Sequence, residues 1–186
     1  DFLSLQADTI DMTASALEVD AAATNDINLD IESPFDRFGP SSSTVSAISQ
    51  SGDVTITEVI GEGGEGQGQG QGQGQGIAVG GILTGQIEGN NITITADSSF
   101  IATSFQQPDS QLVGQNIILN GGPGAGRGEG PGIAVNVNTP NLTANAPGRV
   151  EINSFGQNLN LTSNADDVTV GGINVNAVLS DAIFIT

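Results

Sequence analysis

Two adjacent carboxylates, Asp166 and Asp167, have the clearest potential for chemistry in this chain. Paired acids can act as general acid and general base on a glycosidic bond. A site of this kind also needs cationic or His partners to hold a polyuronate substrate, and the chain has no His and no Lys. We therefore interpret Asp166 and Asp167 as acids at a corner of the fold, and we predict no catalytic residue and no enzyme activity.

The first 32 residues form the most acidic part of the chain and are a candidate calcium site. The acids concerned are Asp8, Asp11, Glu18, Asp20, Asp26, Asp30 and Glu32. Carboxylates stacked on successive strands would repel one another, and a hard cation such as Ca²⁺ relieves such repulsion through oxygen ligation. The segment has no Asp-x-Asp-x-Asp-Gly loop and no Gly-Gly-x-Gly-x-Asp repeat. The sequence thus favours solvated acids and no cofactor, with Ca²⁺ as the alternative.

Two threonine pairs are a third candidate surface. The pairs Thr55-x-Thr57 and Thr93-x-Thr95 each place two hydroxyls on one face of a strand. Ice-binding β-solenoids carry such pairs in continuous flat arrays. Two pairs do not make such an array, so the β-propensity of Thr is the simpler explanation.

The composition of the 186-residue chain excludes several classes of function. Only three bases, Arg37, Arg127 and Arg149, oppose 21 acids, which gives a formal net charge of −18. Three scattered Arg cannot neutralise a run of phosphates, so we predict no nucleic-acid binding. The lack of His, Cys and Lys excludes an imidazole base, a thiol nucleophile and a Schiff base. The longest apolar stretches fall far short of the roughly 20 residues that a spanning helix needs, so we predict no membrane span.

Aliphatic residues alternate along most of the chain with the spacing of β-strands. The pairs include Ile27 and Leu29, Val54 and Ile56, Ile92 and Ile94, Ile117 and Leu119, Leu159 and Leu161, and Val168 and Val170. Thr, Asn, Ser and Asp stand between them, as expected when successive side chains point to opposite faces. Helical spacing is almost absent, and Asp11 to Thr24, the one Ala-rich stretch, fits two short strands better than a helix. The sequence therefore predicts an all-β fold.

These aliphatic pairs belong to a repeat that begins with a turn residue. Its close copies are Gly89-Asn90-Asn91-Ile92-Thr93-Ile94-Thr95, Gly114-Gln115-Asn116-Ile117-Ile118-Leu119-Asn120 and Gly156-Gln157-Asn158-Leu159-Asn160-Leu161-Thr162, and looser copies begin at Gly52 and Asn25. Strands this short, joined by corners of one or two residues, fit a solenoid better than a sandwich or a barrel. We predict one parallel β-solenoid over residues 1–186, with about seven to nine rungs of two or three strands and a length of about 40 Å.

Glycine-rich or proline-containing segments interrupt this repeat and are predicted to be loop insertions. They cover residues 33–50, 61–76 and 121–132. A strand, glycines and Ile-x-Val follow one another at 54–79, 117–135 and 168–175, and only the glycine segment varies in length. Insertions at one corner of a solenoid behave in this way, because they leave the rungs undisturbed. The Gly-Gln alternation from Gly66 to Gly76 is interpreted as a flexible excursion, or alternatively as a polar ladder between molecules.

Several stretches resemble the filamentous haemagglutinin-type exoproteins of bacteria, including their large cyanobacterial relatives. They are the Gly-x-Asn repeats, the run Arg149-Val150-Glu151-Ile152-Asn153-Ser154-Phe155-Gly156 and the run Leu3-Ser4-Leu5-Gln6-Ala7-Asp8-Thr9-Ile10-Asp11. The resemblance covers most of the chain outside the insertions. It implies a right-handed parallel β-helix, export across two membranes and an extracellular or cell-surface role in fibres. The chain starts without Met, a basic n-region or a cleavage site, so we expect it to be part of a longer protein.

The two ends of the chain are the candidate self-association sites. They carry Phe2, Leu3 and Leu5 at the start and Ile183, Phe184 and Ile185 at the finish. A solenoid end exposes unpaired strand edges, and contact between two such ends builds an open fibre rather than a ring. We predict a non-enzymatic extracellular structural protein, either a β-solenoid subunit or a section of a filament or adhesin. Its partners would be further copies or a longer parent rod.

Two alternatives stay open. A carbohydrate-binding or carbohydrate-active β-helix would use aromatic stacking platforms, yet the chain has no Trp and no Tyr. A phage tail-fibre segment would form a trimer. The net charge of −18 favours end-to-end growth over lateral clumping, because a uniformly negative side wall would repel lateral contacts and leave the apolar ends free to join.

Overall fold

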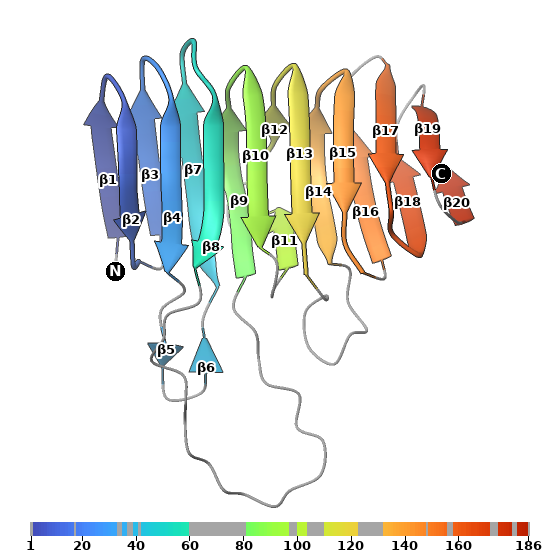
Figure 1. Cartoon of the computed structure of the whole chain (residues 1–186), viewed down its shortest axis with the longest axis horizontal. Coiled ribbons are helices and arrows are strands. Elements are labelled where there is room, and N and C mark those ends of the chain that lie inside the picture. Colours follow the sequence, from blue (N-terminus) through green and yellow to red (C-terminus); the bar gives the residue numbers. More distant parts are fainter. Residues whose placement is uncertain are drawn as a thin grey trace, which may run out of the picture.

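The computed structural model shows a chain built from β-strands and connecting segments (Figure 1). It describes residues 2–16, 18–32, 35–36, 39–40, 42–59, 81–96, 100–103, 110–122, 132–147, 149–155, 158–171, 175–179 and 182–185. Only the backbone is described at 35–36, 39–40, 59, 167, 171, 175–179 and 182–185. None of the described residues lies in a helix, so the predicted all-β fold is confirmed for this part of the chain.

Two parallel sheets contain nearly all the strands. Sheet A consists of β1 (Phe2–Ala7), β3 (Glu18–Ala23), β7 (Ser43–Ser49), β9 (Gly81–Glu88), β11 (Phe100–Thr103), β12 (Leu112–Val113), β14 (Ile133–Asn138), β16 (Arg149–Ser154), β18 (Asp167–Gly171) and β20 (Ala182–Ile185). Sheet B consists of β2 (Ile10–Ala14), β4 (Ile27–Glu32), β8 (Val54–Val59), β10 (Asn91–Ala96), β13 (Asn116–Gly121), β15 (Asn141–Asn145), β17 (Leu159–Ser163) and β19 (Val175–Leu179). A small antiparallel pair, β5 (Phe35–Asp36) and β6 (Gly39–Pro40), stands apart from them.

The chain alternates between the two sheets as it advances along the molecule. Strand positions of sheet A and sheet B alternate along the chain, with β11 and β12 together occupying one position of sheet A, and the strands of each sheet pair in chain order. One rung therefore holds two strands, and the N- and C-terminal ends lie at opposite ends of the stack (Figure 1). This arrangement is the predicted parallel β-solenoid. The prediction allowed two or three strands in a rung, and the structure has two.

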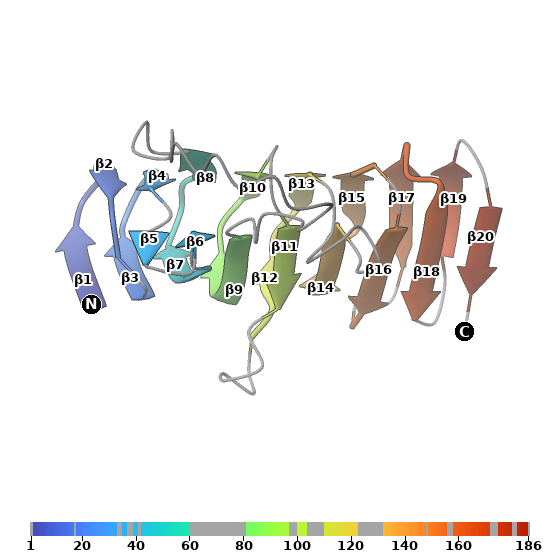
Figure 2. The ribbon, with the colours of Figure 1, turned by 90° about the horizontal axis from the view of Figure 1, so that it is seen from below.

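The hydrophobic core fills the space between the two sheets, which form separate layers in Figure 2. Along sheet B, one inward position is aliphatic in seven successive strands: Ile10, Ile27, Val54, Ile92, Ile117, Leu142 and Leu161. All seven are buried. A core only two side chains deep suits Ile, Val, Leu and Ala, because a wide interior would need larger residues to reach close packing.

The long connections from sheet B back to sheet A share one corner of the solenoid. They are residues 33–42 after β4, 60–80 after β8 and 122–132 after β13. Connections from sheet A to sheet B reach at most four residues, as at 50–53 and 155–158. The segments that follow β8 and β13 thus both connect a strand of sheet B to a strand of sheet A. The copy at 168–175 differs, because it passes from β18 of sheet A to β19 of sheet B.

The predicted loop at 33–50 is too long. Residues 43–49 form β7, a strand of sheet A in which Val45 and Ala47 are fully buried. The serine run Ser41 to Ser43 made this segment resemble a loop in the sequence. Ser43 nevertheless occupies a buried position of β7. Its hydroxyl donates to the carbonyl of Ala16 at 2.8 Å, which satisfies the polar group.

Two other insertions differ from the prediction or cannot be compared with it. Residues 61–76, with the Gly-Gln alternation, lie outside the described residues. Of 121–132, Gly121 still belongs to β13, and Gly122 and Gly132 are described. A further break was not predicted: β11 and β12 both pair with β9 and β14, so residues 104–111 divide one strand position of sheet A.

Two buried serines give a testable contrast. Ser154 is 8% exposed and its Oγ has no hydrogen-bond partner, whereas Ser43 is fully buried and bonded. We expect Ser154→Ala to leave stability unchanged or raise it, and Ser43→Ala to lower the free energy of unfolding by about 1 kcal/mol. Denaturant titration followed by circular dichroism measures both. Equal losses in the two variants would contradict the assignment of Ser154 as unbonded.

Candidate functional site

The N-terminal end of the solenoid leaves part of the core uncovered. Leu3 and Leu5 of β1 and Met12 of β2 are only partly buried, although they pack against the core. On the next strand of sheet A, the partner of Leu3 is Val19, which is fully buried. The difference arises because β1 has a neighbouring strand on one side only. A further rung would cover these side chains.

Phe2 belongs to a different surface from Leu3 and Leu5. It lies opposite Glu18, in a row on the outer face of sheet A, and is 60% exposed. Since side chains alternate across a strand, Phe2 points away from the core that Leu3 and Leu5 face. The predicted N-terminal self-association site is therefore reduced to Leu3, Leu5 and the additional residue Met12.

At the C-terminal end, β20 carries the other three predicted residues. In the ladder, Ile183 lies opposite Val168, Phe184 opposite Thr169, and Ile185 opposite Val170. Val168 and Val170 are buried core residues, so β20 continues the register of the core. This site on β20 lies at the end of sheet A opposite β1, which carries Leu3 and Leu5 (Figure 1). The two sites can meet only between molecules.

The two ends of the solenoid also differ in the number of strands in the last rung. At the N-terminal end, β1 and β2 are the outermost strands of the two sheets. At the other end, β20 extends sheet A beyond β18, whereas β19 is outermost in sheet B. The next strand in the alternating order would pair with the free edge of β19.

A column of hydrogen-bonded side chains follows the corner where sheet A passes into sheet B. Asn116 Nδ2 donates to Asn91 Oδ1 at 2.8 Å, and Asn141 Nδ2 donates to Asn116 Oδ1 at 3.1 Å. Asn160 Nδ2 continues the column to Asn141 Oδ1 at 3.0 Å. Asp53 begins it, because its Oδ1 accepts from Asn91 Nδ2 at 2.8 Å. Each inner amide donates to one rung and accepts from the next, which specifies the register of sheet B.

One Asn of this column differs from the residue expected from the repeat. The third close copy aligns Asn158 with Asn91 and Asn116, but Asn160 is the residue opposite Asn141. Successive partners in the column are separated by 38, 25, 25 and 19 residues. The connections vary in length, so the local motif alone cannot set the register. The glycine of the motif is explained by close packing: a Cβ on Gly52 would lie 2.5 Å from the backbone nitrogen of Asp26.

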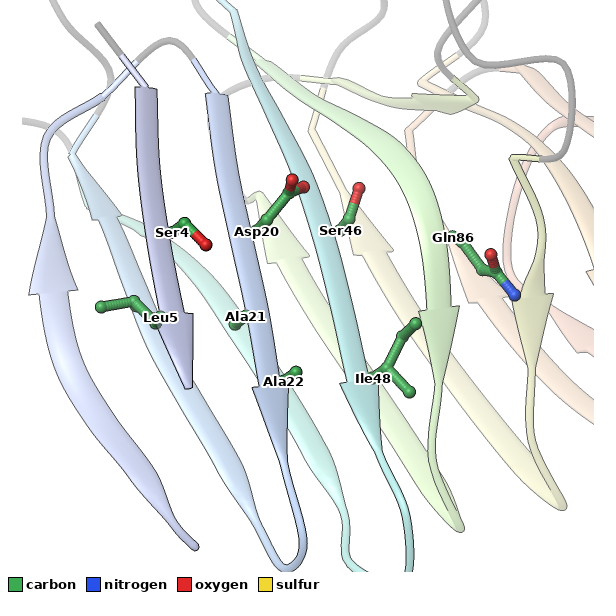
Figure 3. Close-up of a pocket in the computed structure, with 8 residues that line it drawn as sticks. All are labelled: Ser4, Leu5, Asp20, Ala21, Ala22, Ser46, Ile48 and Gln86. Atoms are coloured by element: carbon green, nitrogen blue, oxygen red, sulfur yellow. The ribbon is translucent and has the colours of Figure 1, made fainter. Parts of the chain in front are cut away.

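A shallow groove of about 350 Å³ lies on the outer face of sheet A near the N-terminal end (Figure 3). Its lining consists of Ser4, Leu5, Asp20, Ala21, Ala22, Ser46, Ile48 and Gln86. Ser4, Asp20 and Ser46 lie opposite one another on three strands, and Gln86 stands on β9, where the register shifts. The row offers hydrogen bonds to a hydroxyl-rich ligand. Its lining holds one carboxylate, no cation and no aromatic ring.

The acids of the first 32 residues do not stack on one another as the calcium hypothesis assumed. Asp11 lies opposite Asn28, Asp20 opposite Ser4 and Ser46, and Glu18 opposite Phe2 and Thr44. Within the described residues, no three acidic side chains lie close enough to hold a metal ion. Asp11, Glu18 and Asp20 therefore each lie opposite uncharged partners rather than in a stack of carboxylates.

The adjacent acids lie at a corner, as predicted. Asp166 is exposed in the connection between β17 and β18, and Asp167 begins β18 opposite Arg149. The Arg149 guanidinium forms an ion pair with Glu151 on its own strand. This corner thus presents an exposed acid at the end of a rung.

The threonine pairs are closer together than the sequence suggested. Thr55 lies opposite Thr93, and Thr57 opposite Thr95, so the two pairs form one block on the outer face of sheet B. On the next strand the block gives way to Ile118 and Asn120. A continuous threonine array is therefore not formed across these strands.

Comparison of the chain with protein-family models, curated proteins and solved structures finds no match. No described segment forms a helix of the length and apolarity needed to cross a membrane. The geometry of the ends and faces of the solenoid is therefore the basis for a functional proposal.

Proposed function

We propose that this chain is a non-enzymatic structural protein, a β-solenoid section of an extracellular filament or adhesin that associates end to end. The observation that carries the proposal is the partly buried set Leu3, Leu5 and Met12 at the outermost rung. Covering this set with another rung would bury apolar area and pair the free edges of β1 and β2. The resemblance to filamentous haemagglutinin-type exoproteins supports the extracellular assignment.

The strand order distinguishes a longer rod from a stack of separate copies. A longer rod continues when a strand pairs with β19 in sheet B. A second copy begins with one strand for each sheet, β1 and β2. Because β20 extends sheet A beyond the rung of β18 and β19, β1 of that copy could pair with β20, but its β2 would then not reach β19. Removal of residues 180–186 would let β1 pair with β18 and β2 with β19. We expect this truncation to lengthen the stacks of a homopolymer and to leave association unchanged if the chain is a rod section only.

The end-to-end contact is tested with two double variants on β1. Leu3→Lys with Leu5→Lys places charge in the uncovered core, whereas Ser4→Lys with Gln6→Lys adds the same charge on exposed positions of the same strand. We expect the first variant to shorten the assemblies seen by electron microscopy and sedimentation velocity, and the second to behave as the original chain. A chain that remains a single rod at high concentration, or equal behaviour of the two variants, would refute end-to-end association.

The groove on sheet A supports one second candidate, the binding of a neutral carbohydrate. The side chains of Ser4 and Asp20 supply a hydroxyl and a carboxylate suited to sugar hydroxyls. A glycan array with a hit that Asp20→Ala removes would favour this function.

A further inference from the structure

The outer face of sheet B contrasts with the strongly acidic chain that carries it. Strands β10, β13, β15 and β17 contain no ionisable residue. The outward residues of β8 on this face are Thr55 and Thr57. We call the outward side chains of these five strands the neutral face. The negative wall expected from a net charge of −18 is therefore not uniform.

Charged residues gather on the other surfaces. Sheet A carries Glu18, Asp20, Glu88, Arg149, Glu151 and Asp167 on its strands. On sheet B, Asp11, Asp30 and Glu32 belong to β2 and β4, at the N-terminal end. Glu58 of β8 lies opposite the buried Ile31, at an inward position, and Asp53 precedes β8 at the start of the asparagine column. Exposed charges are screened over a Debye length of about 8 Å at physiological salt. The neutral face is consequently where two copies can approach with the least repulsion.

The centre of the neutral face is apolar. Its middle row is Thr55, Thr93, Ile118, Thr143 and Thr162, which lie opposite one another on consecutive strands. Ile118 stands on the third of the five strands and is 41% exposed. The column of Asn91, Asn116, Asn141 and Asn160 flanks this row on one side. An apolar residue surrounded by polar, uncharged ones is the arrangement of an interface core and its rim.

We propose that the neutral face binds the neutral face of a second copy of this chain, with the two Ile118 side chains facing each other across a two-fold axis. A surface whose apolar residue lies at its centre is self-complementary under such an axis, which is the commonest symmetry of protein dimers. The register of the asparagine column keeps the five strands aligned and the face continuous. The face spans about 20 Å across five strands. A contact of this size between two copies is weak. Binding becomes stronger when two rods pair through several such faces at once.

Cross-linking through single cysteines tests this pairing, because the chain has no Cys of its own. Facing sheets lie about 10 Å apart, too far for a direct disulfide, so a short thiol-to-thiol cross-linker is used. Ile118→Cys is compared with Ile48→Cys, an aliphatic residue of similar exposure on the outer face of sheet A. Both are made with Leu3→Lys and Leu5→Lys, which block the ends. We expect about tenfold more covalent dimer from Ile118→Cys.

A charge test completes the experiment. In the Ile118→Cys chain, Thr93→Asp with Thr143→Asp should reduce the dimer to the level of Ile48→Cys. Thr44→Asp with Thr169→Asp, which adds the same charge on sheet A, should not. All four threonines are only partly buried, so the fold should persist, and circular dichroism checks it. Equal cross-linking of Ile118→Cys and Ile48→Cys, or no effect of the charges on sheet B, would overturn the proposal.

Discussion

Replacement of Leu119 by Ala is expected to lower the free energy of unfolding by about 2–5 kcal/mol. Leu119 is fully buried on β13, and its neighbours along the ladder are Ile94 and Ala144. Truncation would leave a cavity that β13 cannot move in to close, because parallel ladders hold it to β10 on one side and β15 on the other. In a core this narrow, few other side chains can move in to fill the space.

Ile118→Ala is the matched control for this loss. Ile118 precedes Leu119 on the same strand but points to solvent and is 41% exposed, so we expect a change below about 0.5 kcal/mol. Denaturant titration followed by circular dichroism at the strand band compares the two variants. Similar shifts of the midpoint would show that the inward and outward positions of β13 are assigned to the wrong faces.

The second large effect is expected from Asn116→Asp at neutral pH, a loss of roughly 1–2 kcal/mol. Asn116 donates to Asn91 and accepts from Asn141. A carboxylate can still accept from Asn141 but cannot donate to Asn91, so two acceptor oxygens would face each other. The column would be broken between β10 and β13.

The loss should depend on pH in a defined direction. Protonation restores a donor toward Asn91, so the folded state raises the pKa of the introduced carboxyl above its usual value near about 3.9. The stabilising contact is present below that value and is lost as the pH rises through the folded-state pKa. Relative to the original chain, Asn116→Asp should therefore recover stability toward pH 4. Asn116→Ala has no titrating group and should show a deficit that does not change with pH. If Asn116→Asp also keeps a constant deficit, the column does not depend on amide donation.

Much of the fold follows from residue spacing. The alternation of Ile27 with Leu29 and of Ile92 with Ile94 predicted strands, and the short turns between repeats predicted a solenoid. Both predictions are confirmed because period-two burial is a local property that needs no knowledge of distant residues. The stretch from Asp11 to Thr24 likewise forms two strands, β2 and β3.

The candidate sites were predicted less well, because they depend on which residues of different rungs meet. The sequence offered Phe2 with Leu3 and Leu5, but alternation places Phe2 on the other face. It treated the acids near the start as stacked, whereas the register separates Asp11 and Asp20 from other carboxylates. The signal for the neutral face was present in Ile118, an aliphatic residue at an outward position between two inward ones.

The sequence by itself determined that this chain forms short β-strands with an aliphatic inner side, turns at Gly and Asn, and a surface nearly free of bases. These properties arise from each residue and its near neighbours. Only the tertiary structure decided that a rung has two strands and that residues 43–49, predicted as part of a loop, form β7. It also decided that Asn160 rather than Asn158 joins the asparagine column. The physical reason is that connections of variable length change the sequence distance between rungs, while ladder pairing and core packing set the register in space.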